Sequence, residues 1–364
     1  MKTMRPIPSP PMKSPRHAAG FTIIELMVGM LVGLIATVVM FQVFAVSEGQ
    51  KRTTTGAGDA QQNGVGSIFV LEREARMAGF GMSYPAGAGC VVSGFSGTDD
   101  IPISFKMVPY LIADGVGGAP DSLTLAFADT RSFTSPPKLA LPATPTGLVT
   151  TYSRFGFSKG DLFILTSNTQ PGCTLYQVQD LPGTDGIDHK KGTYVDAYGV
   201  TRNTTFNKSG GNTSTTYAKW DIAKNLGTRI INLGQKPTVV NYSLVGSQLV
   251  MTDVLNPGPQ VVVSDGIVQF QVQYAIDGTN WADTLPDPTG VVGIRFAIVS
   301  RSATPERPDP ATGVCATTTA APRWTAANRP LDVSADPNWM CYRYRVFEMA
   351  VPARNLIWAP QEGV

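Results

Sequence analysis

The chain has 364 residues, of which 43% are hydrophobic and 15% are charged. This composition is typical of a folded protein with one large domain or two modest ones, and it excludes a disordered tail. The formal net charge is only +2, so the chain lacks the broad basic field of a nucleic-acid-binding protein. We therefore do not expect nucleic acid as a partner.

A basic leader, residues 1–20, comes first. Its formally charged side chains are Lys2, Arg5, Lys13 and Arg16, and without them 25 basic residues remain against 27 acidic ones. The positive-inside rule keeps such a leader on the cytoplasmic side of a membrane. The rest of the chain is then expected on the exported side.

Residues 21–46, FTIIELMVGMLVGLIATVVMFQVFAV, are apolar except for a few side chains and contain one ionisable group, Glu25. As a helix they would span about 39 Å, enough for a hydrocarbon core of about 30 Å. A signal peptide fits less well, because its apolar part has about 7 to 15 residues and ends at an A-x-A site. A carboxylate in a bilayer needs a partner. A cut between Gly20 and Phe21 would supply one, since the new ammonium group would lie one helical turn from Glu25.

The sequence GFTIIE around this cut resembles the class III signal of type IV pilins and type II secretion pseudopilins. The resemblance implies that prepilin peptidase cuts after Gly20, that Phe21 is methylated and that Glu25 recruits the subunit to a filament. It also implies a single-pass inner-membrane chain with a periplasmic globular part, which later reaches the pilus or cell surface. Gly29 and Gly33 form a G-x-x-x-G motif, which favours close packing of membrane helices. A simple membrane anchor with an accidental Glu25 is the alternative.

The helical pattern continues beyond the apolar run. Five glycines follow that run, and each costs about 1 kcal/mol inside a helix, so we expect bending or local melting there. From Val65 the apolar spacing predicts an amphipathic helix that stops near Gly79 and Gly81. Together these segments predict a pilin helix over residues 21–80, with residues 21–46 transmembrane.

The exported part, residues 81–364, is expected to be rich in β-strands. Strand-like segments, rich in β-branched and aromatic residues, begin at Ser122, Asp161, Cys173, Thr238, Ser247, Gln260, Ile267, Val291 and Cys341. Three stretches rich in Pro, Gly, Ser or Thr, residues 132–145, 203–216 and 302–337, are expected to be exposed loops. The predicted fold class is α+β and similar to type IV pilins, with a long N-terminal helix packed on an antiparallel sheet.

Segments at both ends of the exported part narrow the resemblance to the minor pilin family PilW. They are QQNG from Gln61, LEREARMAGF from Leu71, GIVQFQVQY from Gly266, GIRFAIVSRS from Gly293 and RYRVFE from Arg343. The resemblance implies a noncatalytic subunit that primes or tips a type IV pilus, with links to twitching motility and cell adhesion. Its implied partners are other minor pilins and the major pilin, which it contacts through the N-terminal helix.

Two alternative functions remain. One is a type II secretion minor pseudopilin, which would share the helix. The other is a tip-located adhesin or DNA-uptake module, with recognition in residues 132–216 or 302–337. Residues 90–240 depart from the PilW pattern by insertions, so any partner preference of that region is not implied by the resemblance.

Four cysteines, Cys90, Cys173, Cys315 and Cys341, all follow the apolar run. An even number on the exported side is consistent with two disulfides, although four cysteines allow three pairings. We favour Cys90 with Cys173 and Cys315 with Cys341, because each pair closes a shorter loop. Buried free thiols are the alternative.

No catalytic, cofactor-binding or metal-binding motif is recognised. Of two histidines, His17 lies in the leader, and His189 in the sequence DHKK is expected to be a solvated surface residue. Asp277, Asn280 and Asp283 place oxygen atoms at steps of three, which is compatible with Ca²⁺ but lacks the order of an EF-hand. An ordinary Asx-Gly hairpin connection is the favoured interpretation of that loop.

Overall fold

The computed structural model describes residues 20–82, 87–130, 135–169, 172–309 and 311–357. The chain divides into two compact units, residues 1–54 and 55–364, and each is described by itself. The basic leader, apart from Gly20, lies outside the described residues.

The first helix, α1 (Ile23–Met77), is continuous, so the local melting expected at the glycines is wrong. Two of these glycines are packing positions instead. A Cβ atom at Gly64 would lie 1.9 Å from Cε2 of Phe347, and one at Gly56 would lie 2.9 Å from Cβ of Ser302. Glycine fits at both positions because the Phe347 ring of β20 and Ser302, which follows β17, lie close to the helix, and this packing offsets the low helix propensity of glycine.

Residues 55–77 of α1 bury one face against the strands. The buried residues recur at steps of three and four, and they are Gly56, Ala60, Gly64, Ser67, Leu71 and Ala75. All but Leu71 are small, which lets polar side chains of the strands reach the helix backbone. Ser300 Oγ, for example, donates a hydrogen bond of 2.7 Å to the carbonyl of Ala60.

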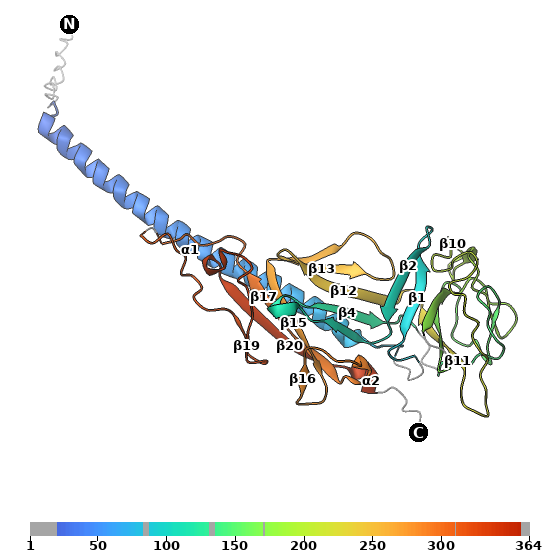
Figure 1. Ribbon diagram of the computed structural model, residues 1–364. Coiled ribbons are helices and arrows are strands. Elements are labelled where there is room, and N and C mark those ends of the chain that lie inside the picture. Colours follow the sequence, from blue (N-terminus) through green and yellow to red (C-terminus); the bar gives the residue numbers. More distant parts are fainter. Residues whose placement is uncertain (1–19, 83–86, 131–134, 170–171, 310, 358–364) are drawn as a thin grey trace, which may run out of the picture. The chain divides into compact units, whose positions relative to one another are not determined.

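Two sheets pack on this part of α1, and we call these sheets and residues 55–77 the platform (Figure 1). The first sheet consists, in spatial order, of β14 (Val261–Asp265), β13 (Gln248–Asp253), β12 (Thr238–Val245), β4 (Ser122–Phe127) and β3 (Tyr110–Ala113). The second consists of β16 (Trp281–Ala282), β15 (Ile267–Ala275), β17 (Gly293–Arg301) and β20 (Tyr344–Pro352). All pairings in both sheets are antiparallel, as predicted.

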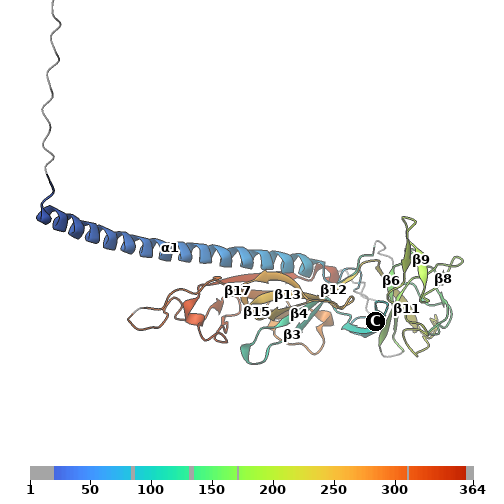
Figure 2. The same cartoon turned by 90° about the horizontal axis from the view of Figure 1, so that it is seen from above.

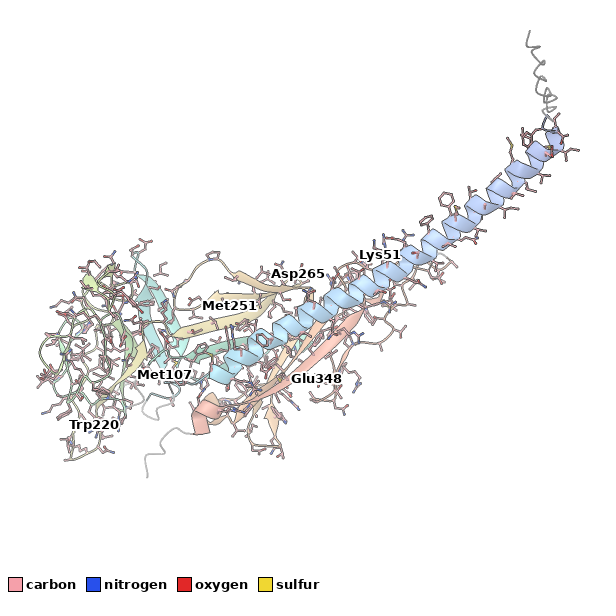
Figure 3. The ribbon with its side chains drawn as sticks, turned by 180° about the vertical axis from the view of Figure 1, so that it is seen from behind. Lys51, Met107, Trp220, Met251, Asp265 and Glu348 are labelled. Carbon is pink, nitrogen blue, oxygen red and sulfur yellow. A yellow bond between two sulfur atoms is a disulfide. The ribbon has the colours of Figure 1, made fainter. Side chains whose placement is uncertain are left out.

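The platform core lies between the helix and the two sheets. Viewed from behind, Met251 of β13 and Glu348 of β20 appear on either side of the helix (Figure 3). Tyrosine hydroxyls tie the last turns of α1 to the sheet: Tyr110 donates to the Ala75 carbonyl at 2.9 Å, and Tyr242 donates to Glu74 Oε2 at 2.6 Å.

The end of α1 is capped by a distant side chain. Asn355, in the short helix α2 (Arg354–Ile357), donates through Nδ2 to the carbonyls of Arg76, Met77 and Ala78. The Met77 carbonyl also accepts from the Phe80 amide at 3.1 Å, and the Asn355 contact adds a donor for carbonyls that a helix end leaves without an intrahelical partner.

A five-stranded sheet forms a second part of the unit, and with its ribbons we call it the insert lobe (Figure 2). Its strands, in spatial order, are β11 (Thr228–Gly234), β6 (Leu162–Ser167), β7 (Cys173–Gln177), β1 (Val91–Ser96) and β2 (Ile101–Lys106). β1 and β7 are parallel, and the other neighbours are antiparallel. Two small ribbons pair β5 (Val149–Thr150) with β8 (Gly186–Ile187) and β9 (Thr193–Val195) with β10 (Thr201–Asn203).

The central strands β6 and β7 are buried at every position. One face of their sheet packs towards Ala126 of β4 and Val239 of β12. The other face is covered by Leu139 and Ala143, which lie in the stretch 132–145 predicted as an exposed loop, and by Tyr217, among other side chains. Phe206, from the predicted loop at residues 203–216, is buried on the first face. The prediction is therefore wrong for part of each of these two stretches, because a sheet buried on both faces needs apolar cover on both.

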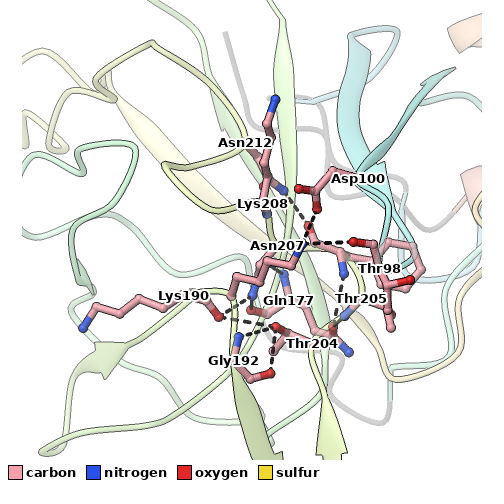
Figure 4. A network of polar contacts seen from close by, with 12 residues as sticks. Thr98, Asp100, Gln177, Lys190, Gly192, Thr204, Thr205, Asn207, Lys208 and Asn212 are labelled. Atoms are coloured by element: carbon pink, nitrogen blue, oxygen red, sulfur yellow. Dashed lines mark hydrogen bonds and ion pairs between the residues drawn. The ribbon is translucent and has the colours of Figure 1, made fainter.

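The segment rich in Thr and Asn, residues 203–216, is fixed to β7 by side-chain amides (Figure 4). The Asn207 side chain accepts a hydrogen bond of 2.8 Å from the backbone amide of Gln177 and donates one of 2.7 Å to the backbone carbonyl of Gln177. Asn212 donates to the carbonyls of Leu175 and Phe206, each at 2.6 Å. These bonds continue the strand pattern without a further strand, so the segment is ordered by its asparagines.

Residues 302–337 cover the outer face of the second platform sheet. They contain the two-residue strands β18 (Arg323–Trp324) and β19 (Arg329–Pro330), and they bury Trp324, Leu331 and Val333 against Ala297 and Val299 of β17. This segment, too, is only partly the exposed loop that was predicted. The remaining elements are the 3-10 turns η1 (Val116–Gly118), η2 (Pro288–Gly290) and η3 (Trp339–Cys341).

Candidate functional site

The N-terminal segment of the first unit leaves its predicted cut accessible. Gly20 and Phe21 precede α1, Phe21 is 86% exposed, and a Cβ atom at Gly20 would meet no atom within 4 Å. An exposed dipeptide outside a helix can enter a protease without unfolding the helix. The site expected from the sequence is thus sterically open in the described part of this unit.

Thr22 and Glu25 form a capping box at the start of α1. The backbone amide and the hydroxyl of Thr22 both donate to Glu25 Oε2 at 3.1 Å, and the Glu25 amide donates to Thr22 Oγ1 at 3.2 Å. Each side chain thereby satisfies an amide that the helix start leaves unpaired. The sequence analysis missed Thr22, although the pattern T-x-x-E before an apolar run is the signal that identifies it.

The capping box leaves half of the carboxylate available. Both Thr22 groups donate to Oε2, and within the described residues no group donates to Oε1 of Glu25. Glu25 is therefore held in a fixed rotamer while one oxygen can still accept a hydrogen bond from another molecule.

The apolar part of α1 in the first unit is exposed throughout. The first part of α1 is long and apolar enough to cross a membrane, and no other helix in the described residues meets that measure. Gly29 and Gly33 lie one turn apart, and a Cβ atom at either would meet no atom within 4 Å. Such a surface needs lipid or other apolar helices to cover it.

The N-terminal segment matches a known sequence family. Residues 15–41 match the family described as prokaryotic N-terminal methylation motif. The chain carries this motif. The match contains Gly20, Phe21 and Glu25, and it covers the apolar start of α1 rather than the platform or the insert lobe.

No curated protein matches the chain. Among solved structures, the chain is similar to a type IV-like pilin from Thermus thermophilus, with 10% sequence identity and a TM-score of 0.30. The similarity covers 79% of this chain and 92% of that one. A TM-score of 0.30 is too low to argue from. The α+β fold is instead shown directly by the helix and sheets of the platform and by the sheet of the insert lobe.

Two disulfides tie the second unit. Cys90 is bonded to Cys173, and Cys315 to Cys341, which are the pairs that close the shorter loops. The first joins the start of β1 to β7 within the insert lobe, and the second closes the segment that covers β17. No described cysteine is free.

The loop from Asp277 to Asp283 does not have the geometry of a calcium site. Asp277 accepts hydrogen bonds from the amides and side chains of Thr279 and Asn280, at 2.6 to 2.9 Å. Asp283 instead forms an ion pair of 2.8 Å with Arg329. Within the described residues no three His, Cys, Asp or Glu side chains are grouped to hold a metal ion.

His189 is buried rather than solvated, so the prediction from its charged neighbours is wrong. The side chain is 3% exposed, its ring centroid lies 4.2 Å from that of Tyr176, and Nε2 has no hydrogen-bond partner among the described residues. Burial is the main cause of a lowered pKa for His189, with Asp188 opposing the shift. The residue is a neutral core side chain.

Acidification is expected to destabilise the insert lobe through His189. The unfolded histidine has a pKa of about 6.5, so below that pH the unfolded state binds a proton that the folded state takes up less readily. The stability that neutral His189 provides is complete above about pH 6.5 and is lost as the pH falls. Thermal unfolding of the chain and of His189→Phe at pH 7.5 and pH 5 should show the smaller acid effect in the variant.

The test depends on the difference between the acid effect on the parent chain and the acid effect on His189→Phe, because other groups also titrate in this pH range. Burial raises the pKa of Asp121 and of Asp161 to about 6. The folded state therefore binds protons at these two groups more readily than the unfolded state, and both groups increase the stability as the pH falls. An equal response of both proteins to acid would contradict the assignment of a buried neutral His189.

Proposed function

We propose that the chain is a minor pilin of a type IV filament, similar to the PilW family, with a structural and noncatalytic role. The methylation motif at residues 15–41 carries the proposal, because it combines Gly20, Phe21 and Glu25 with an apolar helix. The inner membrane stores the chain, the platform and the insert lobe lie in the periplasm, and assembly moves the subunit to the pilus or cell surface. Oxidising conditions there suit the two disulfides.

Processing and assembly use the same few residues. Prepilin peptidase cuts after Gly20, Phe21 becomes the methylated N-terminus, and the ammonium group of a neighbouring subunit approaches Glu25. The capping box holds the Glu25 rotamer, and the oxygen without a donor accepts the ammonium hydrogen bond. An unpaired charge among apolar helices is costly, so the pair selects one axial register between subunits.

Mass spectrometry of the N-terminal peptide from membranes and from sheared filaments tests this function. A chain that begins with N-methylated Phe21 is the expected result. An intact leader, or a cut after Val46, would contradict the proposal and leave an anchored or secreted domain.

Replacing Glu25 by alanine is expected to leave cleavage intact and to remove the protein from sheared filaments. The matched control is Glu48→Ala, because Glu48 is an exposed acid on the same helix that pairs only with Arg52 at 3.3 Å within the described residues. Immunoblots of membrane and filament fractions measure both. Normal incorporation of the Glu25 variant would contradict the role of this carboxylate.

The bulk of the subunit supports a proposal for its place in the filament. A platform with an added insert lobe is large for a repeating subunit, so we place it at the tip, where it primes assembly with other minor pilins and then the major pilin. Immunogold labelling at pilus ends supports this, whereas even labelling along the shaft contradicts it. Pull-down of secretion-system subunits instead would favour the pseudopilin alternative.

A further inference from the structure

The insert lobe contains a cavity of about 440 Å³, a volume within the range of small-molecule sites. Five parts of the chain line it: residues 129–130 after β4, the turn at residues 156–161, Leu181, the tip of the β9 and β10 hairpin, and residues 232–235 at the end of β11. All of them belong to the region that departs from the PilW pattern. Neither the methylation motif nor the proposed assembly role accounts for this cavity.

A buried carboxylate faces this cavity with unused hydrogen-bonding capacity. Asp161 is 5% exposed, and its Oδ2 accepts from the Ser158 amide at 2.8 Å and from Asn232 Nδ2 at 3.0 Å. In the part of the chain that the structure describes, no group donates to its Oδ1. Asp129 also lines the cavity, is exposed, and has no side-chain hydrogen bond among the described residues.

The wall beside Asp161 is held in place by side-chain amides. Asn232 donates to the Gly156 carbonyl at 2.8 Å, and Gln235 donates to the Lys159 carbonyl at 3.1 Å. The turn at residues 156–161 is thus fixed at three points, including the contact of Asp161 with Ser158. A ligand would meet a preorganised surface, which lowers the entropic cost of binding.

An exposed aromatic ring also lines the cavity. Tyr198 is 88% exposed although its hairpin tip is well anchored, since Asp196 accepts from the amides of Tyr198 and Val200, each at 2.9 Å. Asp196 also pairs with Arg202 at 2.7 Å. A rigid tip that presents a bare ring beside polar groups offers a flat apolar face next to hydrogen-bond acceptors.

The charges of the cavity restrict the ligand. Lys159 is paired with Asp180 at 2.7 Å and Asp196 with Arg202, whereas Asp129 and Asp161 have no cationic partner among the described residues. The unpaired carboxylates repel anions and attract hydrogen-bond donors. A metal ion alone fits poorly, since the cavity far exceeds an ion and the described residues hold no cluster of three acidic or metal-ligating side chains.

We propose that this cavity binds a sugar residue that is uncharged or carries an amino group. The sugar donates hydroxyl or ammonium hydrogen bonds to Asp161 and Asp129, and its apolar ring face stacks on Tyr198. The inference goes beyond the assembly role and does not depend on it, because the cavity and the N-terminal segment share no residue.

The test uses the full chain in a polyoxyethylene detergent, since detergents with sugar head groups would compete. The probes are the methyl glycosides of glucose, galactose, mannose, N-acetylglucosamine and glucosamine, with glucuronate as an anionic comparison. Saturation-transfer NMR and calorimetry measure binding to the parent chain, Tyr198→Ala and Asp129→Asn. Tyr152→Ala is the matched control, because Tyr152 is an exposed tyrosine of the same lobe, 57% accessible, that does not line the cavity.

At least one neutral or amino sugar should bind, and each cavity variant should raise its Kd about tenfold or more while the control leaves it unchanged. Circular dichroism of each variant verifies folding. Absence of binding by every probe, preference for glucuronate, heat of binding with CaCl₂ alone, or unchanged binding in both cavity variants would overturn the proposal. The N-terminal mass is a separate readout, so failure here leaves the assembly role untouched.

Discussion

Gly64→Ala is expected to lower the free energy of unfolding of the second unit by about 1–3 kcal/mol, because a methyl group there overlaps the Phe347 ring. Alanine has no rotamer that relieves the overlap, so either the Phe347 ring must leave its position against the helix or β20 must move away from α1. Chemical denaturation of the full chain in detergent, followed by tryptophan fluorescence, measures the change.

A second glycine on the same helix provides the control. Gly66 is exposed and a Cβ atom there would meet no atom within 4 Å, so Gly66→Ala should stabilise the unit by up to about 1 kcal/mol through helix propensity alone. Adding Phe347→Leu to Gly64→Ala should recover part of the loss, and the double-mutant cycle isolates the contact. Equal stabilisation by both glycine variants would show that β20 does not approach the helix at Gly64.

Removing the disulfide between Cys90 and Cys173, as a double serine variant, is expected to cost about 4 kcal/mol or more by loop entropy. The two cysteines are separated by 83 residues, and long loops gain the most from closure. The bond also joins two separate parts of the chain within one sheet, β1 and β7. Hydrogen exchange should therefore increase in β6 and β7 before it increases in β17 and β20.

The other disulfide is the matched comparison. Cys315 and Cys341 are separated by 26 residues, which predicts a smaller cost of about 3.5 kcal/mol, located in the segment that covers β17. If both double variants opened the same strands to exchange, the insert lobe would not be a separately stabilised part of the unit.

The fold was predictable where a strand carries its own pattern. β12, β15 and β17 have long runs of β-branched and aromatic residues, and all were located from the sequence. β1 reads VVSGFS, and its glycine and serines hide the strand. It pairs with its neighbour β2 and, on its other edge, with β7, where Val92 lies opposite Cys173 in a distant contact that no local pattern encodes. The burial of Trp324 in a segment rich in Pro and Thr is likewise a tertiary effect.

Of the two candidate sites, the N-terminal segment could be predicted from the sequence and the cavity in the insert lobe could not. Gly20, Phe21 and Glu25 are local in sequence, so the resemblance of their short segment to the class III signal predicted the region that the methylation motif covers. The cavity in the insert lobe brings together Asp129, Asp161 and Tyr198 from three distant segments. Carboxylates and aromatic residues are too common for such a set to be selected without a structure. His189 was misjudged for a related reason, since its lysine neighbours face outward while its own ring packs inward.

The insert lobe has a topological consequence for the history of the chain. Its main segment departs after Phe127 of β4 and returns at Thr238 of β12, and these two residues are paired across the adjacent strands. An exchange of residues 128–237 therefore leaves the register of both platform strands unchanged. Selection can alter what the outer part recognises while the helix and its two sheets stay constant. In related chains, substitutions and changes in length should concentrate between those two positions.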